Sequence, residues 1–140
     1  MDSKSGIDIE KELFKAFIIP NKKLRYVELV DTKRGREKIL RSLDHFSDLD
    51  TRVCHKINPS EPSLPSIYKR LRDLGAPSAC YVVSSNADLD GQELDLSQAL
   101  KEVIGHGMGA FVSCLPGRLA YFESEERNGR YICYVPGAQA

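Results

Sequence analysis

The chain has 140 residues, of which 41% are hydrophobic and 29% are charged, and its 20 basic and 20 acidic side chains give a formal net charge of zero. This length fits one domain with a substantial core, and the apolar content excludes a wholly disordered chain. A net charge of zero argues against a protein that binds nucleic acid over its whole surface by charge alone, although a local basic patch stays open.

The sequence contains no segment typical of export or membrane insertion. Residues 1–15 are charged and lack the apolar centre of a signal peptide, and every apolar run is much too short to cross a bilayer. We therefore expect a soluble, cytoplasmic protein that makes no membrane contact.

Four cysteines are present, and none are spaced as Cys-x-x-Cys. Cys80, Cys114 and Cys133 lie in apolar runs typical of strands, so we expect reduced thiols that serve as small core residues. Cys54 is the only thiol for which we expect fast reaction with a reagent. Cys54 and His55 are adjacent and would face opposite sides of a strand, which argues against a metal site.

The first third of the chain predicts a layer of about three helices. Apolar residues recur at helical spacing between residues 8 and 46, and Pro20 separates the first helix from the second. The second helix is predicted over 21–31, and either Asp31 or Thr32 can cap the third.

The rest of the chain alternates between strand-like and helix-like segments. The pattern predicts a strand over 52–57, a helix over 64–74 ended by Gly75, a strand over 79–84, a helix over 96–104 capped by Asp95, and three strands within 107–135.

Two turn signals join the last three strands. Pro116-Gly117 suits a type II turn, because proline sets the first φ and glycine accepts the positive second one. Asn128-Gly129 is typical of a type I′ hairpin turn, in which both central residues need positive φ.

Together these elements predict an α/β protein with a mixed five-stranded sheet of order βαβαβββ along the chain. Strand–helix–strand units favour parallel pairing, and we expect the last two strands to add antiparallel at one edge. We treat residues 1–140 as a single domain, with 1–7 frayed, 8–46 as the helical layer and 52–135 as the sheet region.

The polar loop 84–91 is the first candidate site. It follows a strand predicted to be buried, and ligands of open α/β sheets bind beyond the carboxyl ends of parallel strands. Asp88 and Asp90 can together hold a hard cation such as Mg²⁺. The alternative is an ordinary solvated turn, because these residue types favour turns on backbone grounds alone. The candidate ligand-binding residues are Ser84, Ser85, Asn86, Asp88 and Asp90.

A basic stretch over residues 22–41 is the second candidate site. It holds eight Lys or Arg residues against three Asp or Glu residues. Two short helices joined by a turn can present such charge to nucleic acid. The alternative is a solvated helix face with pairs such as Glu37–Arg41. The candidate nucleic-acid contacts are Lys33, Arg34, Arg36 and Lys38.

Four segments resemble a family of uncharacterised bacterial proteins of similar length. They are KLRYVELV, GREKILRSLDHFSDLD, LGAPSACYVVSS followed by LDG, and GMGAFVSCLPGRLAYFESEE, which together span about residue 16 to residue 134. That family has no established activity, so the resemblance implies a stand-alone bacterial domain and assigns no site residue.

These observations favour a non-enzymatic cytosolic binding or regulatory module. The alternative is a small enzyme with a carboxylate site at the loop 84–91, assisted by a metal ion or acting without one. The sequence predicts no resident metal and no cofactor. A protein partner or a second copy of the chain stays open, and nucleic acid is possible but not favoured.

Overall fold

The computed structural model describes residues 5–58, 64–126 and 129–136. They form five α-helices, two 3₁₀-helices and six strands: α1 (Gly6–Phe17), η1 (Pro20–Lys22), α2 (Lys23–Val30), α3 (Lys33–Ser42), η2 (Leu43–His45), β1 (Cys54–Lys56), α4 (Leu64–Asp73), β2 (Ala79–Ser84), β3 (Glu93–Asp95), α5 (Leu96–Val103), β4 (Ala110–Leu115), β5 (Leu119–Glu123) and β6 (Arg130–Tyr134).

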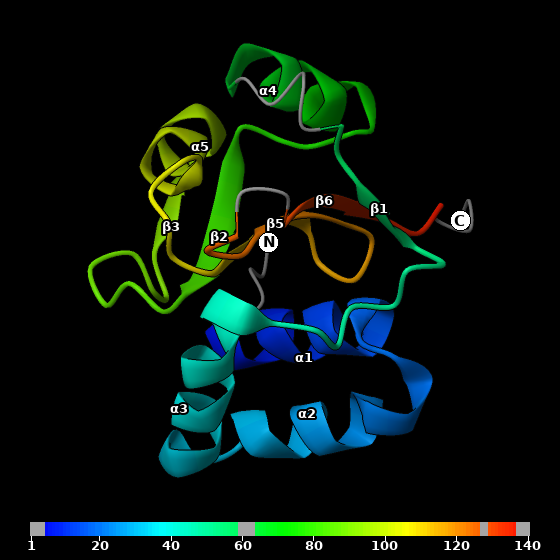
Figure 1. Cartoon of the computed structure of the whole chain (residues 1–140), viewed down its shortest axis with the longest axis vertical. Coiled ribbons are helices and arrows are strands. Elements are labelled where there is room, and N and C mark those ends of the chain that lie inside the picture. The colour runs from blue at the N-terminus through cyan, green and yellow to red at the C-terminus, as the bar shows by residue number, and fades with distance from the viewer. Residues whose placement is uncertain (1–4, 59–63, 127–128, 137–140) are drawn as a thin grey trace.

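The elements form three layers, with the sheet in the middle. The strand order is β1-β6-β5-β4-β2-β3, and every neighbouring pair is antiparallel. Helices α1, α2 and α3 cover one face of the sheet, at the bottom of Figure 1, and α4 and α5 cover the other face, at the top.

The α/β class is confirmed, but the predicted strand number and strand directions are wrong. The sheet has six strands because Glu93–Asp95, for which no strand was expected, pairs with β2 as β3. This short strand reverses the chain before α5, so β4 returns antiparallel to β2 rather than parallel. Strands β1 and β2 do run in the same direction, but β6, β5 and β4 lie between them.

The edge of the sheet also differs from the prediction. The last hairpin, β5 and β6, was expected at an edge, but it lies inside the sheet because β1 pairs with the outer side of β6. Residue Cys54 of β1 lies opposite Cys133 of β6 in this register. The edge strands are β1 and β3, and each has only three residues. Such short edges limit pairing with other chains.

The expected helix ends are largely confirmed. Thr32 caps α3 by accepting a hydrogen bond from the Gly35 amide at 2.9 Å, and Gly75 follows α4 with a φ of 110°. Ser5 caps α1 and the helix begins at Gly6, so regular structure starts within the segment 1–7, for which fraying stays a prediction. Residues 1–4 lie outside the described part of the chain.

One of the two turn predictions is confirmed. The Arg118 amide donates to the Leu115 carbonyl at 2.9 Å, and the φ of Gly117 is 73°, as a type II turn over Pro116-Gly117 requires. The prediction of a two-residue type I′ turn at Asn128-Gly129 is wrong. Such a turn would pair residue 127 with Arg130, whereas Arg130 pairs with Glu123 and the Gly129 carbonyl accepts from the Ser124 amide at 2.8 Å. Asn128 itself lies outside the described residues.

Two hydrophobic clusters fill the spaces on either side of the sheet. The cluster under the helical layer is rich in aromatic rings. The Phe111 ring lies 4.6 Å from the Phe122 ring on the neighbouring strand, and Phe46, which follows η2, lies 5.7 Å from Phe111 and 5.8 Å from Tyr26. These contacts fix the helical layer against the sheet.

Among the described residues, no helix combines the length and the apolar character needed to cross a membrane.

Candidate functional site

The loop 84–91 is tied into the fold by its own polar side chains. The Ser84 hydroxyl donates to the Gly109 carbonyl at 3.1 Å and accepts from the Asn86 amide at 2.9 Å. The Ser85 hydroxyl donates to Asp44 at 2.7 Å, which joins the loop to η2. The Asn86 side chain accepts from the Asp88 amide at 3.0 Å. These contacts give three of the candidate residues a structural role.

Asp90 and Arg36, each predicted for a different site, form one network. The Arg36 guanidinium donates to both Asp90 carboxylate oxygens, at 2.6 and 2.8 Å, and to both Glu10 oxygens, at 2.8 Å each. The Tyr81 hydroxyl donates to Glu10 at 2.6 Å. Hydrogen bonds to Asp90 and then to Glu10 raise the pKa of Arg36, so the guanidinium stays charged. The network joins α1, α3 and the loop after β2.

The carboxylates of Asp88 and Asp90 do not converge on one site. Asp88 is exposed to solvent, whereas Asp90 is occupied by Arg36 and also accepts from the Ser84 amide at 3.0 Å. Within the described residues, no group of three or more His, Cys, Asp or Glu side chains is placed to hold a metal ion. Ligand binding by the loop stays a prediction, and its contacts favour the alternative of a structural turn.

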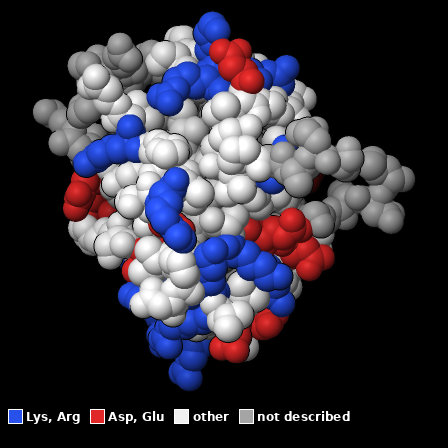
Figure 2. Space-filling view, turned by 90° about the vertical axis from the view of Figure 1, so that its right-hand side faces the viewer, with Lys and Arg blue, Asp and Glu red and all other residues white. Residues whose placement is uncertain are grey.

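The basic stretch divides into one structural cation and several exposed ones. Arg36 is half-buried in the network above, whereas Lys33, Arg34 and Lys38 are exposed. Among the residues that the structure describes, Glu37 and Arg41 make no ion pair with each other, although their spacing favours one. On the face seen in Figure 2, Lys and Arg side chains cover much of the lower part of the molecule, where the helical layer lies.

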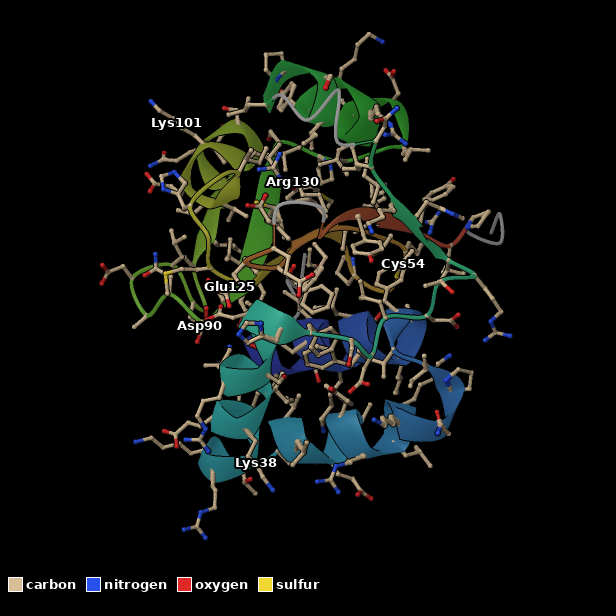
Figure 3. The ribbon with its side chains drawn as sticks, in the orientation of Figure 1. Lys38, Cys54, Asp90, Lys101, Glu125 and Arg130 are labelled. Carbon is tan, nitrogen blue, oxygen red and sulfur yellow. The ribbon has the colours of Figure 1, made fainter. Side chains whose placement is uncertain are left out.

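A cavity of about 180 Å³ opens between α2, α3 and the segment that follows η2. Its apolar walls come from Tyr26 and Leu29 of α2 and from Ile39 of α3. Lysine and arginine side chains stand at its rim, and Lys38 projects from α3 near the point where α3 approaches α2 (Figure 3). The lining residues are Lys22, Arg25, Tyr26, Leu29, Lys38, Ile39, Ser42 and Asp48.

The polar floor of this cavity is organised around Asp48. The Tyr26 hydroxyl donates to one Asp48 oxygen at 2.5 Å, and the Lys22 ammonium donates to the other at 3.2 Å. Burial and the hydrogen bond to Asp48 raise the pKa of Tyr26, so the phenol stays protonated. The cavity therefore holds one carboxylate that is already paired with Lys22 and two further cations, Arg25 and Lys38, that make no ion pair within the described chain.

The sequence signalled only part of this cavity. Lys38 was a candidate, but as a contact to nucleic acid. Neither Tyr26 nor Asp48 was among the candidate site residues. Their hydrogen bond spans 22 residues of sequence, so no local pattern could reveal it.

The four cysteine side chains are all buried and unpaired by disulfides. Burial raises the pKa of Cys80 to about 12 and raises the pKa of Cys114 as well. Burial and a hydrogen bond with Cys54 raise the pKa of Cys133. A thiol with a raised pKa has little thiolate at neutral pH, so Cys114 is not poised as a nucleophile.

We expect none of the four thiols to react quickly with a thiol reagent in the native protein. Cys54, which the sequence suggested as the accessible one, is only 2% exposed. Ellman's reagent should therefore label the cysteines at the rate of opening or unfolding, and in denaturant it should label all of them at once. One thiol that reacts in the native state as fast as free cysteine would contradict this expectation.

Comparison of the chain with models of protein families, with curated proteins and with solved structures gives no match. The resemblance to a family of uncharacterised bacterial proteins thus stays a prediction, and the site has to be interpreted from its own chemistry.

Proposed function

We propose that the protein is a non-enzymatic binding or regulatory module that takes an anionic partner on the part of its helical layer formed by residues 20–48. The supporting observation is that ion pairs engage three carboxylates in and beside these residues but leave most of the cations unpaired. The carboxylates Glu10, Asp48 and Asp90 are engaged by Arg36 and Lys22. Six cations of these residues make no ion pair within the described part of the chain: Lys23, Arg25, Lys33, Arg34, Lys38 and Arg41.

The positions of the loop carboxylates support a binding module over the enzymatic alternative. General acid–base work by Asp90, or metal binding by it, requires release from a guanidinium that holds both of its oxygens. Asp88 stands apart in solvent. An enzyme would instead bring such groups together in one concave pocket.

Binding of a multivalent anion should stabilise the native protein. We expect tripolyphosphate to raise the midpoint of thermal unfolding above that seen in chloride at equal ionic strength, because a ligand that binds only the folded state stabilises it. A variant with Lys33, Arg34, Lys38 and Arg41 all changed to Gln should lose most of this shift. Arg36 is left intact, because its replacement would disturb the fold.

The matched control removes four exposed cations elsewhere. Lys56, Arg70, Lys101 and Arg118 lie outside the helical layer, and their joint change to Gln lowers the net charge equally. An equal loss of the shift in both variants, or no shift in the native protein, would contradict the proposal. Duplex DNA is a second probe. If it binds, and the logarithm of its binding constant falls with the logarithm of salt concentration by about 0.9 for each phosphate contact, the partner is nucleic acid.

A further inference from the structure

The cavity between α2 and α3 has the properties of a small-molecule site. It joins an apolar interior to a charged rim, as ligand pockets do, and its residues come from three separate elements and the segment after η2. We propose that it binds a small phosphate monoester with a compact apolar body, such as a single ring. This inference rests on the proposed function and names the ligand class for part of the same layer.

The volume of the cavity sets the size of the apolar body. A cavity of about 150 Å³ lined by apolar side chains takes up benzene, and this one measures about 180 Å³. The body of one ring is therefore of a size to lie between Leu29, Ile39 and the Tyr26 ring. Tyr26 is itself held in place, with its ring 5.5 Å from Phe14 and 5.8 Å from Phe46.

The charges of the lining residues favour a dianion. Lys22, Arg25 and Lys38 contribute three positive charges, and Asp48 contributes one negative charge, which leaves an excess of two. Arg25 lies on α2 and Lys38 on α3, so a phosphate at the rim would be held from both helices. A guanidinium can also grip two phosphate oxygens at once.

The floor of the cavity offers polar groups to a ligand, and its one carboxylate, Asp48, is already hydrogen-bonded. Both oxygens of Asp48 already accept hydrogen bonds, from Tyr26 and Lys22. The Ser42 hydroxyl donates to the Ile39 carbonyl at 2.7 Å in the structure, and rotation of this hydroxyl lets it donate to a ligand oxygen instead.

The test is a titration of isotope-labelled protein with phenyl phosphate, followed by amide resonances at constant ionic strength. Inorganic phosphate and phenol are titrated separately as the two parts of the probe. We expect phenyl phosphate to bind at least tenfold more tightly than either part and to shift the resonances of Tyr26, Leu29 and Ser42. Equal affinity for inorganic phosphate, or shifts confined to residues away from the cavity, would overturn the proposal.

Two double variants test the charged rim. Arg25→Gln/Lys38→Gln removes two of the three cations that line the cavity. This double variant should weaken the binding of phenyl phosphate about tenfold, since two exposed charge contacts are lost. Lys33→Gln/Arg34→Gln removes two exposed cations of the same layer that do not line it and should change the affinity less than twofold. Equal weakening by both variants would overturn the proposal.

The two proposals fail in different ways. If tripolyphosphate stabilises the protein through the helical layer but phenyl phosphate does not bind, the ligand class is wrong and the proposed function stands. If neither anion binds, both are wrong.

Discussion

Replacement of Arg36 by methionine is expected to destabilise the protein more than any other change to a single charged residue of the helical layer. Its guanidinium makes four hydrogen bonds to Glu10 and Asp90, and the Glu10 side chain is only 3% exposed. Without Arg36, two carboxylates face each other with no cation between them. The expected loss in the free energy of unfolding is about 3 kcal/mol, the lower end for a broken buried pair, because Arg36 keeps some contact with solvent.

Denaturant unfolding followed by circular dichroism measures this loss. Arg34→Met is the matched control, because Arg34 is an exposed arginine on the same helix, and its effect should stay within about 0.5 kcal/mol. Adding Glu10→Gln and Asp90→Asn to Arg36→Met should recover part of the stability, since the unpaired charges are then removed. Equal stability of Arg36→Met and Arg34→Met would show that the network contributes nothing.

The role of Arg36 also shows why the candidate sites were only partly predictable. Sequence reasoning placed Arg36 with three neighbouring cations and placed Asp90 in a polar loop. The pair is separated by 54 residues, and it forms because α1 and α3 pack beside the end of β2. Composition marks both residues as polar candidates, but only the tertiary arrangement shows that they neutralise each other.

The helices were predictable because their signals are local. The Thr32 and Asp95 side chains each cap the helix that follows them, and periodic apolar residues mark the buried faces. The strand directions were not predictable, because they depend on β3, a strand of three residues with the sequence Glu-Leu-Asp. Nothing in such a short polar segment distinguishes a strand from a loop, yet its presence reverses the direction of every strand that follows.

Replacement of Gly109 by alanine is the second change with a large expected effect. Glycines recur over residues 105–109, and Gly105 after α5 has the positive φ typical of a helix end, at 81°. Gly109 has a different role. A Cβ atom there would lie 2.3 Å from both the carbonyl carbon and the carbonyl oxygen of Leu43, which are backbone atoms of η2.

The close approach is held by hydrogen bonds on both sides of Gly109. Its amide donates to Asp44 at 2.7 Å, and its carbonyl accepts from the Ser85 amide at 3.1 Å and from the Ser84 hydroxyl at 3.1 Å. An added methyl group forces η2 away from the start of β4 and so weakens these bonds. We expect Gly109→Ala to cost about 3 kcal/mol, the upper end for an overpacked site, because backbone rather than a side chain must move.

Gly107→Ala separates this steric effect from backbone strain. The φ of Gly107 is 75°, but a Cβ atom there would meet nothing within 4 Å. Alanine at position 107 should therefore lower the free energy of unfolding only by the cost of a left-handed backbone conformation, about 1 kcal/mol. Urea unfolding of the two variants under the same conditions makes the comparison. If the loss in stability at Gly109 is no larger than the loss at Gly107, η2 moves aside at little cost. The packing of the helical layer on the sheet would then depend on the aromatic contacts of Phe46 rather than on this backbone contact.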